Sequence, residues 1–441
     1  MYSKEHGFIK YRAGLICILF LARSILSVGQ AVDDTLGPKS TLSQCITFAL
    51  AYQSLIKQSL IDESITERDI RIALSGWYPQ MEINANLQHY LKVPIGYTAG
   101  TYGSTAIFTA NQTLYDSKLF FAARTSRELR NQASENTENS KIDTYVNVTK
   151  AFFDVLLTED QLVVLNEDIL RLQQNYKDAY NLYKNGLTDN IDYQRTEISL
   201  SNAQAQRKSA EETIKAKYAV LKQYMGVAPE KPLTISYDSS KYEKEILFDT
   251  TKNLDYTNRI EYKILQSSLT LQGSAISYYK WSALPAVSAF YDFNLSYGNE
   301  QFLNLYKNGN QNSIFGLTLS LPLFQGMSRL QNLSKAKLQY QRLQHGLDYL
   351  KSEINSEYTL AFSTYISNLN EMKIAKKNIS VAKHIFNTVK LQYEKGIKAY
   401  LEVIVSETDL RTTELNYLNT LFRVLSSKMD LEKALGVIKI N

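Results

Sequence analysis

The chain has 441 residues, a length that suits two or three globular domains rather than one. Its 49 lysines and arginines nearly balance its 44 aspartates and glutamates, and no basic cluster is interleaved with aromatic residues, which excludes a typical nucleic-acid-binding surface. The four histidines lack metal-ligand spacing, and no phosphate-binding glycine loop or nucleophile motif occurs, so we expect no metal, no cofactor and no enzymatic activity.

The first 29 residues have the pattern of a secretory signal peptide. Several basic residues precede a short apolar run at residues 15–22, and small residues at 27–29 form a cleavage site for export. Cys17 falls within this leader and follows the bulky Ile16, so we do not expect it to carry a lipid. No later apolar run approaches the roughly 18 residues that a membrane-spanning helix needs, so any crossing of a membrane would have to use strands.

A first repeat is predicted over residues 30–227. Its opening helix begins at Thr41, which can cap it, and ends before Pro79. Strands follow at about 81–91 and 105–115, the first of them with a strict alternation of apolar and polar residues.

A very long helix follows the second strand. Neither glycine nor proline occurs from Ser117 to Asn185, and a helix of this length would span roughly 100 Å. The chain is expected to reverse at Gly186 and to return as a helix from Leu187 to Met225. No ordinary globular domain needs a helix this long, so the hairpin itself is the main structural unit.

The second repeat is predicted over residues 253–441, after a polar, proline-containing segment at 228–252 that separates the repeats. It has the same order of elements as the first. Their expected positions are a helix ending at Trp281, strands at about 286–297 and 314–323, a long helix over 327–395, a reversal at 396 and a return helix over 397–435.

The two predicted reversals identify the chain as an internal duplication. Tyr393-Glu394-Lys395-Gly396-Ile397 corresponds to Tyr183-Lys184-Asn185-Gly186-Leu187 at an offset of 210 residues. The correspondence continues at the same offset from Met225-Gly226-Val227 to Leu435-Gly436-Val437. A match at one fixed offset indicates two copies of one unit. In each copy the glycine of Tyr-x-x-Gly is the expected turning point, because glycine adopts positive φ at little cost.

Apolar residues recur every seven positions along both long helices. They are Val148, Val155, Leu162, Ile169, Tyr176 and Tyr183 in the first repeat, and Tyr358, Tyr365, Met372, Ile379, Phe386 and Tyr393 in the second. A seven-residue repeat over this length predicts coiled-coil packing with knobs in holes. One apolar face of a soluble helical bundle would explain these heptads but not the strands.

Each predicted strand is about ten residues long and has one apolar and one polar face, as strands of outer-membrane barrels do. The edge of a soluble β-sandwich would show the same alternation. Four strands cannot close a barrel, and an open edge in lipid would leave backbone groups unpaired. If these strands lie in a membrane, the chain must therefore oligomerise, and three chains would supply twelve strands.

The doubled order of helix, two strands, long helix and return helix resembles the TolC family of outer membrane efflux channels. The resemblance extends over the chain after the leader. The segments that carry it are the opening helix around Leu42-Ser43-Gln44-Cys45-Ile46, the strand-to-helix exit Leu319-Ser320-Leu321-Pro322-Leu323-Phe324-Gln325-Gly326 with its looser first copy Gln112-Thr113-Leu114-Tyr115-Asp116, and the two Tyr-x-x-Gly reversals.

The resemblance implies a mostly helical homotrimer with a membrane β part. Its long coiled-coil helices would form an α-barrel, and four strands per chain would contribute to a twelve-stranded transmembrane β-barrel. The location implied is the outer membrane lipid of a Gram-negative bacterium, with a large periplasmic part. The expected function is a passive exit channel of a tripartite efflux or type I secretion system. It would dock with a periplasmic adaptor (membrane fusion) protein and an inner-membrane pump of the RND or ABC class.

The resemblance also implies a gate and a docking surface at the reversals. The tip and adaptor-docking residues would be Tyr183, Gly186, Leu187, Tyr393, Gly396 and Ile397. In such proteins acidic side chains after the second reversal narrow the pore, and Glu402 matches the first of two such positions. The second is Val405 here, a departure that puts a double acidic ring in doubt.

Three further residues near the reversals are gate candidates. Asp189 and Asp192 follow the first reversal, and Lys398 could pair with a neighbouring acid to hold the tip shut. Copies of one carboxylate around a narrow axis would favour cations. Alternatively, Asp192 and Glu402 only place negative charge near helix N-termini. The alternative function is a soluble periplasmic or secreted coiled-coil protein with a binding or structural role.

Overall fold

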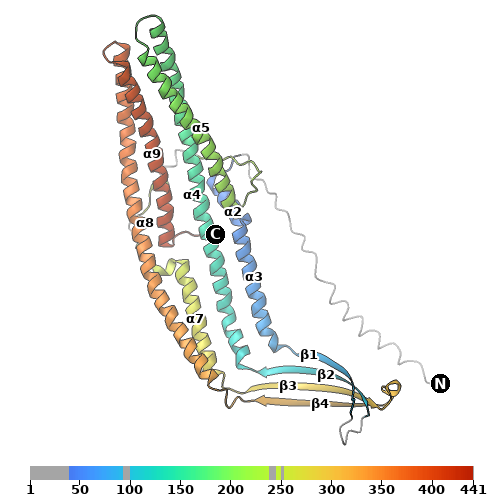
Figure 1. The fold of residues 1–441 in the computed structure, drawn as a ribbon. Coiled ribbons are helices and arrows are strands. Elements are labelled where there is room, and N and C mark those ends of the chain that lie inside the picture. The colour runs from blue at the N-terminus through green and yellow to red at the C-terminus, as the bar shows by residue number, and fades with distance from the viewer. Residues whose placement is uncertain (1–38, 93–99, 238–244, 250–252, 441) are drawn as a thin grey trace, which may run out of the picture. The chain divides into compact units, whose positions relative to one another are not determined.

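A computed structural model describes residues 39–92, 100–237, 245–249 and 253–440. The predicted signal peptide, its cleavage site and Cys17 lie outside the described residues. The described part consists of two long helical hairpins, shorter helices packed beside them and one four-stranded sheet (Figure 1). This mostly helical, duplicated fold with a few antiparallel strands confirms the predicted fold class.

The opening helix differs from its prediction, because the structure divides it in two at Gln53. Helix α2 spans Leu42–Tyr52 and α3 spans Ser54–Leu74, and Gln53 between them is extended, with φ −62° and ψ 129°. The Gln53 side chain accepts hydrogen bonds from the backbone amides of Leu55 and Ile56, so it caps α3. A side chain that satisfies two free amides offsets the hydrogen bonds lost at the break.

The sheet joins the two repeats edge to edge. Its strands, in the order β1-β2-β3-β4, are antiparallel and span Gln80–His89, Tyr102–Tyr115, Ala286–Asn299 and Gly309–Ser320. The β2–β3 pairing, from Tyr102 opposite Asn299 onward, connects the repeats. Strand β4 begins before the predicted position at 314, because Gly309 and its neighbours pair with β3. Ladder hydrogen bonds from a neighbouring strand thus outweigh the loop-like composition of this segment.

One face of the sheet is apolar across all four strands. Met81, Ala110, Tyr291 and Phe315 form one cross-strand row on it, with the exposed Ile83, Leu317 and Leu319 on the same face. Strands β1 and β4 are the edges of the sheet within one chain. An apolar face that stays exposed, together with two open edges, is the arrangement expected of a sheet that is completed by other surfaces.

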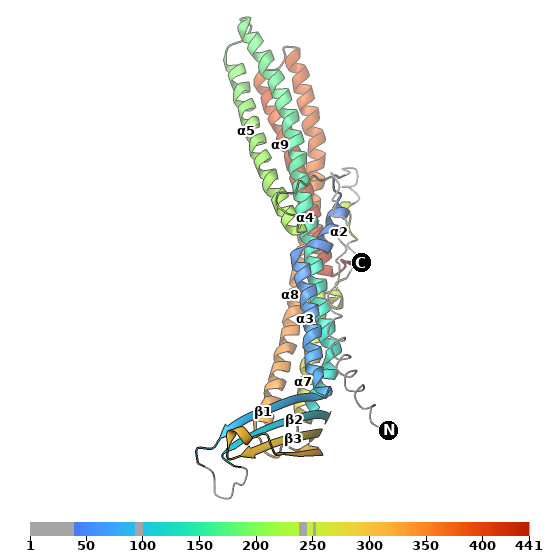
Figure 2. The same cartoon turned by 90° about the vertical axis from the view of Figure 1, so that its right-hand side faces the viewer.

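Each repeat continues from its sheet strands into a long hairpin. Helices α4 (Ser117–Lys184) and α5 (Ile191–Met225) form the first hairpin, and α8 (Ser328–Glu394) and α9 (Tyr400–Leu435) form the second. Asp116 separates β2 from α4 and caps the helix, accepting from the amide of Lys118 at 2.6 Å. The sheet therefore lies at one end of the long helices and the reversals at the other (Figures 1 and 2).

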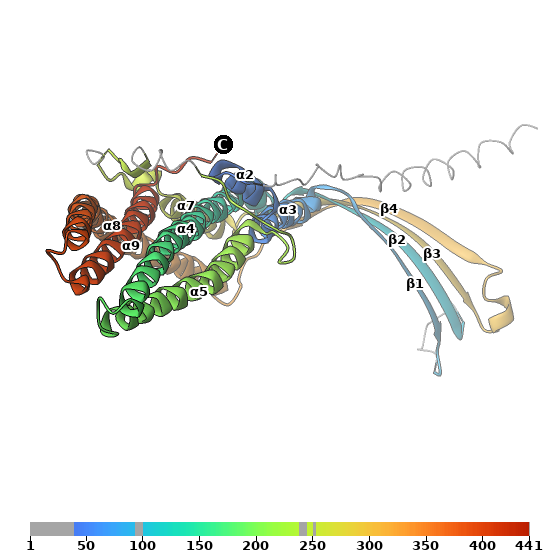
Figure 3. The same cartoon turned by 90° about the horizontal axis from the view of Figure 1, so that it is seen from above.

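Both return helices begin later than predicted, at Ile191 and Tyr400, because the residues after each glycine form the turn. Helix α7 (Ile260–Trp281) packs on α4 and α8 in the half of the molecule near the sheet, as α3 packs on α4 (Figure 3). None of the described helices has an apolar stretch long enough to span a membrane.

The heptad positions supply the buried core between the helices. Val148, Val155 and Ile169 of α4 and Tyr365 and Phe386 of α8 are buried. Toward the reversal the burial falls off, and Tyr183 is an exposed aromatic residue. The predicted coiled-coil face is thus confirmed over most of its length, and it opens to solvent at the tip.

Each return helix ends in a glycine with a left-handed backbone. Gly226 has φ +72° and Gly436 has φ +65°. A Cβ on Gly226 would lie 2.9 Å from the Cα of Gln53, and one on Gly436 would lie 2.8 Å from the backbone of Asn258. Glycine is therefore required at both positions for two reasons, the positive φ and the close approach of another chain segment.

Replacement of Gly226 by alanine should destabilise the protein more than replacement of Gly186. Both glycines have φ above +70°, which costs about 1–2 kcal/mol for an L-residue. A Cβ on Gly186 meets nothing within 4 Å, so G226A alone adds a steric clash. Thermal unfolding in detergent, followed by circular dichroism, should give a lower midpoint for G226A. Equal midpoints would contradict the close approach to Gln53.

Candidate functional site

The two reversals have nearly the same backbone. Gly186 has φ +71° and Gly396 has φ +73°. The amide of Leu187 donates to the carbonyl of Leu182 at 3.0 Å, and that of Ile397 donates to Gln392 at 2.9 Å. These are the hydrogen bonds of a helix that ends in a left-handed glycine. The Leu187 and Ile397 side chains are 70% and 71% exposed, so each tip presents an apolar residue to solvent.

Aromatic residues join the first and second hairpins just behind the tips. The Thr196 hydroxyl on α5 donates to the Tyr400 hydroxyl on α9 at 3.0 Å, in a buried position. Tyr400 also packs against Phe386 and Val403, and its ring centroid lies 5.2 Å from that of Tyr393. Burial raises the pKa of Tyr400 well above its ordinary range, so its hydroxyl stays neutral in this contact.

The predicted gate residues lie at the start of each return helix. Lys398 and Glu402 form an ion pair at 2.6 Å, on the exposed side of the second reversal. Asp189 accepts from the amide of Ile191, the first residue of α5, at 2.9 Å. Partial burial, followed by the charge of Asp189, raises the pKa of Asp192. The structure thus brings Lys398 and Glu402 together at the second reversal, and Asp189 and Asp192 together at the first.

A buried ionic cluster connects α4 to α9 further from the tips. Asp168 accepts from Arg411 at 2.8 Å and from Arg171 at 3.3 Å. Glu407 lies 3.4 Å from the Nε of Arg171 and accepts from the Asn175 amide at 2.9 Å. Asp168 is wholly buried and Glu407 is 1% exposed. Two carboxylates and two guanidinium groups therefore share one site between the hairpins.

Sequence reasoning did not identify this cluster. Asp168 and Arg171 are three residues apart and Glu407 and Arg411 are four apart, which are spacings that put two side chains on one helix face. That pattern also fits two exposed ion pairs, so the spacing alone carries no signal of burial. What distinguishes the cluster is that the two faces meet, and this depends on how the hairpins pack.

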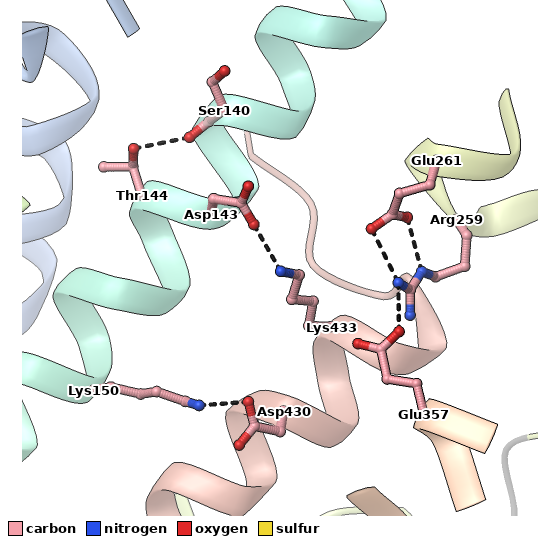
Figure 4. A network of polar contacts seen from close by, with 9 residues as sticks. All are labelled: Ser140, Asp143, Thr144, Lys150, Arg259, Glu261, Glu357, Asp430 and Lys433. Carbon is pink, nitrogen blue, oxygen red and sulfur yellow. Dashed lines mark hydrogen bonds and ion pairs between the residues drawn. The ribbon is translucent and has the colours of Figure 1, made fainter. Parts of the chain in front are cut away.

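A second polar network ties α9 into the fold near its C-terminal end (Figure 4). Arg259, at the start of α7, pairs with Glu261 at 3.0 Å and with Glu357 of α8 at 2.8 Å. The same guanidinium donates to the carbonyl of Ala434 at 3.0 Å. Two further ion pairs between α4 and α9, drawn in the same figure, are Asp143 with Lys433 at 2.7 Å and Lys150 with Asp430.

These contacts can hold helices in register. The described residues contain no group of histidine, cysteine, aspartate and glutamate side chains arranged to hold a metal ion. The ion pairs of Arg171 with Glu407, of Arg411 with Asp168 and of Lys433 with Asp143 all cross from α4 to α9. The arrangement is that of a structural and conformational site.

Replacement of Asp168 by asparagine should destabilise the protein strongly. Asparagine keeps the volume but leaves Arg171 and Arg411 short of a buried anion, and breaking a buried pair typically costs about 3–5 kcal/mol. Thermal unfolding should show a much lower midpoint for D168N. Glu212→Gln is the matched control, because Glu212 pairs with lysines on the exposed face of α5 and should change little. Similar midpoints for D168N and the control would contradict the buried cluster.

The fold places the chain among known proteins. The sequence matches the outer membrane efflux protein family over residues 48–227 and 279–437. A search of curated proteins gives no match. Among solved structures, CusC, a protein that forms a transmembrane channel, superposes with a TM-score of 0.75 at 17% identity, covering 93% of this chain and 95% of that one.

Two further structures agree with this fold. VceC, an outer membrane protein from Vibrio cholerae, has a TM-score of 0.71 at 15% identity and covers 90% of this chain and 96% of its own. The open state of the MtrE outer membrane channel from Neisseria gonorrhoeae has a TM-score of 0.71 at 16% identity, covering 90% and 89%. With both repeats matched in order, the chain belongs to the outer membrane efflux protein family.

Proposed function

We propose that the protein is a passive, trimeric exit channel of a tripartite efflux or type I secretion system. As a family member it lies in the outer membrane of a Gram-negative bacterium, with a large periplasmic part. One observation carries the proposal. A sheet with an exposed apolar face is joined to two helical hairpins, and the long helix of each hairpin is roughly 100 Å in length. A membrane end and a distant tip are what a conduit between two membranes requires.

The open edges of the sheet support a trimer. Strands β1 and β4 have no neighbour on one side within the chain, and in lipid every backbone group must be paired. Three copies, with β4 of one chain beside β1 of the next, would close a barrel of twelve strands. The apolar row through Met81 and Phe315 would then face lipid.

The tips are the proposed gate and docking surface. Three copies of Asp192 and Glu402 around an axis would give a negative constriction that favours cations. The pairing of Lys398 with Glu402 reduces that charge at the second reversal, and Asp189 adds to it at the first. The exposed Leu187 and Ile397, with Tyr183 beside the first reversal, offer apolar contact to a periplasmic adaptor, behind which an inner-membrane pump of the RND or ABC class would supply energy.

Fractionation tests the channel against the alternative of a soluble coiled-coil protein. We expect the protein in the outer membrane fraction, extracted only by detergent, and a trimer by light scattering of the purified material. The apolar sheet face is too extended to remain in water. A monomer released with the soluble periplasmic contents would contradict the proposal.

Removal of the candidate gate charges should raise conductance. The double variant Asp192→Ala with Glu402→Ala loses the carboxylates that narrow and charge the tip, so single-channel conductance in a planar bilayer should increase and cation preference should fall. Glu212→Ala, which removes an exposed acid elsewhere on α5, is the control and should conduct as the wild type does. Unchanged conductance in the double variant would remove both residues from the gate.

A further inference from the structure

The four charges of the buried α4–α9 cluster are not equally satisfied. Asp168 accepts hydrogen bonds from both Arg171 and Arg411. Glu407 accepts only the Asn175 amide, through Oε2, among the residues that the structure describes. Its Oε1 faces the Nε of Arg171 at 3.4 Å, and within the described residues neither atom has a hydrogen-bond partner. The less satisfied carboxylate is therefore Glu407.

Glu407 is also shielded from bulk solvent. The Arg171 and Arg411 side chains are 27% and 12% exposed, whereas Asp168 and Glu407 are enclosed, and the Nε of Arg171 that faces Glu407 is itself buried. An ionised carboxylate that lacks both water and well-directed donors is costly. Burial, followed by the negative charge of Asp168, raises the pKa of Glu407 to about 7.

The charged and polar groups that act on Glu407 come from two helices, and are Asp168, Arg171 and Asn175 of α4 and Tyr400 of α9. The same Asp168 pairs with Arg411, and Asp168 and Arg171 also act on Glu414, beside which stand Glu167 of α4 and Lys383 of α8. Asp168 opposes ionisation of Glu407, while Arg171 and Asn175 favour it less strongly. Glu414 is half-buried, and burial raises its pKa as well. Burial and the neighbouring Asp168 therefore disfavour a negative charge on Glu407.

We propose that Glu407 is a proton-controlled clamp between the two helical hairpins. Its protonated form holds α4 against α9, and its ionised form favours an arrangement in which this contact opens and water reaches the carboxylate. The inference rests on the proposed channel function, because α4 and α9 belong to different hairpins and their separation would loosen the tip. Asp168 with its two arginines fixes the register in which the clamp closes.

Proton linkage gives the direction of the effect. The closed contact binds the Glu407 proton more tightly than a hydrated glutamate does, so acid favours the closed contact and deprotonation favours opening. If the hydrated carboxylate has its ordinary pKa, raising the pH from about 6 to about 8 should increase the ratio of open to closed contacts by about tenfold.

Hydrogen–deuterium exchange on the full chain in detergent tests the clamp. The wild type and Glu407→Gln, which mimics the protonated side chain, are compared with each other at about pH 6, 7 and 8, so that the intrinsic pH dependence of exchange cancels. In segments 165–175 of α4 and 403–411 of α9 the wild type should already exchange faster than Glu407→Gln at pH 6, because a hydrated glutamate is ionised at that pH. The ratio of the wild-type rate to the Glu407→Gln rate should then rise about tenfold from pH 6 to pH 8.

Two further variants make the result decisive. Glu212→Gln, which removes an exposed carboxylate on α5, should keep the wild-type response to pH. Should Glu407→Gln fail to fold, Glu407→Met removes the same charge at similar length and serves in its place. A ratio of exchange rates that stays constant from pH 6 to 8 would overturn the clamp.

Conductance over the same pH range separates the clamp from the channel function. Single-channel openings of the wild type should become more frequent as the pH rises, and those of Glu407→Gln should not. If the protein conducts but the ratio of exchange rates does not change with pH, the clamp is overturned and the channel function stands. A protein with the pH-dependent exchange ratio but no conductance would overturn the channel and leave the clamp contact.

Discussion

The packing of α4 against α9 is the contact on which the rest of the structure depends, because it joins the helical parts of the two repeats. Helix α4 also contacts α3, α5 and α7, so it is shared by both halves of the molecule. At its N-terminal end α4 is separated from β2 by the single residue Asp116, and β2 pairs with β3 of the second repeat. The repeats are therefore joined at two levels, by backbone hydrogen bonds in the sheet and by side chains between the helices. The second kind can rearrange without breaking secondary structure.

The duplication is visible in the sequence at four glycines, because the backbone conformation at these positions requires glycine. Gly226 and Gly436 each end a return helix at positive φ and touch the backbone of the segment that leads into a helix of the same repeat, at Gln53 and at Asn258. Gly186 and Gly396 reverse the chain in open space. Glycine cannot be replaced at the first kind of position without a clash, whereas at the second kind only the strain in φ opposes a change. The two copies thus keep their glycines for related but different reasons.

Periodic features could be predicted from the sequence, because one face of an element repeats the same environment at each turn or pleat. The heptads of α4 and α8 and the alternation in β1 are of this kind, and the core and the sheet face follow them. Features set by a neighbouring segment could not be predicted. The break at Gln53 lies where Gly226 of a distant segment approaches the backbone, and the early start of β4 depends on the ladder offered by β3. The burial of Asp168 and Glu407 depends on which helix faces meet, and ion-pair spacing is the same on exposed and buried faces.

The two tips share a backbone but differ in charge, and this difference bears on how such a channel could be regulated. At the first reversal Asp189 accepts from the first amide of α5, and Asp192 lies under the opposing influence of Asp189 and Arg195 without a salt bridge like that of Glu402 among the residues that the structure describes. At the second, Lys398 neutralises Glu402, and the exposed Val405 stands where the family pattern has a second acid. Charge that is exposed at a tip is screened by salt and responds weakly to small movements. Charge that is buried between hairpins responds strongly, because any opening changes its solvation. If the protein is the proposed channel, a weakly charged tip combined with Glu407 in the interior would shift control from the mouth of the pore to the contact between α4 and α9.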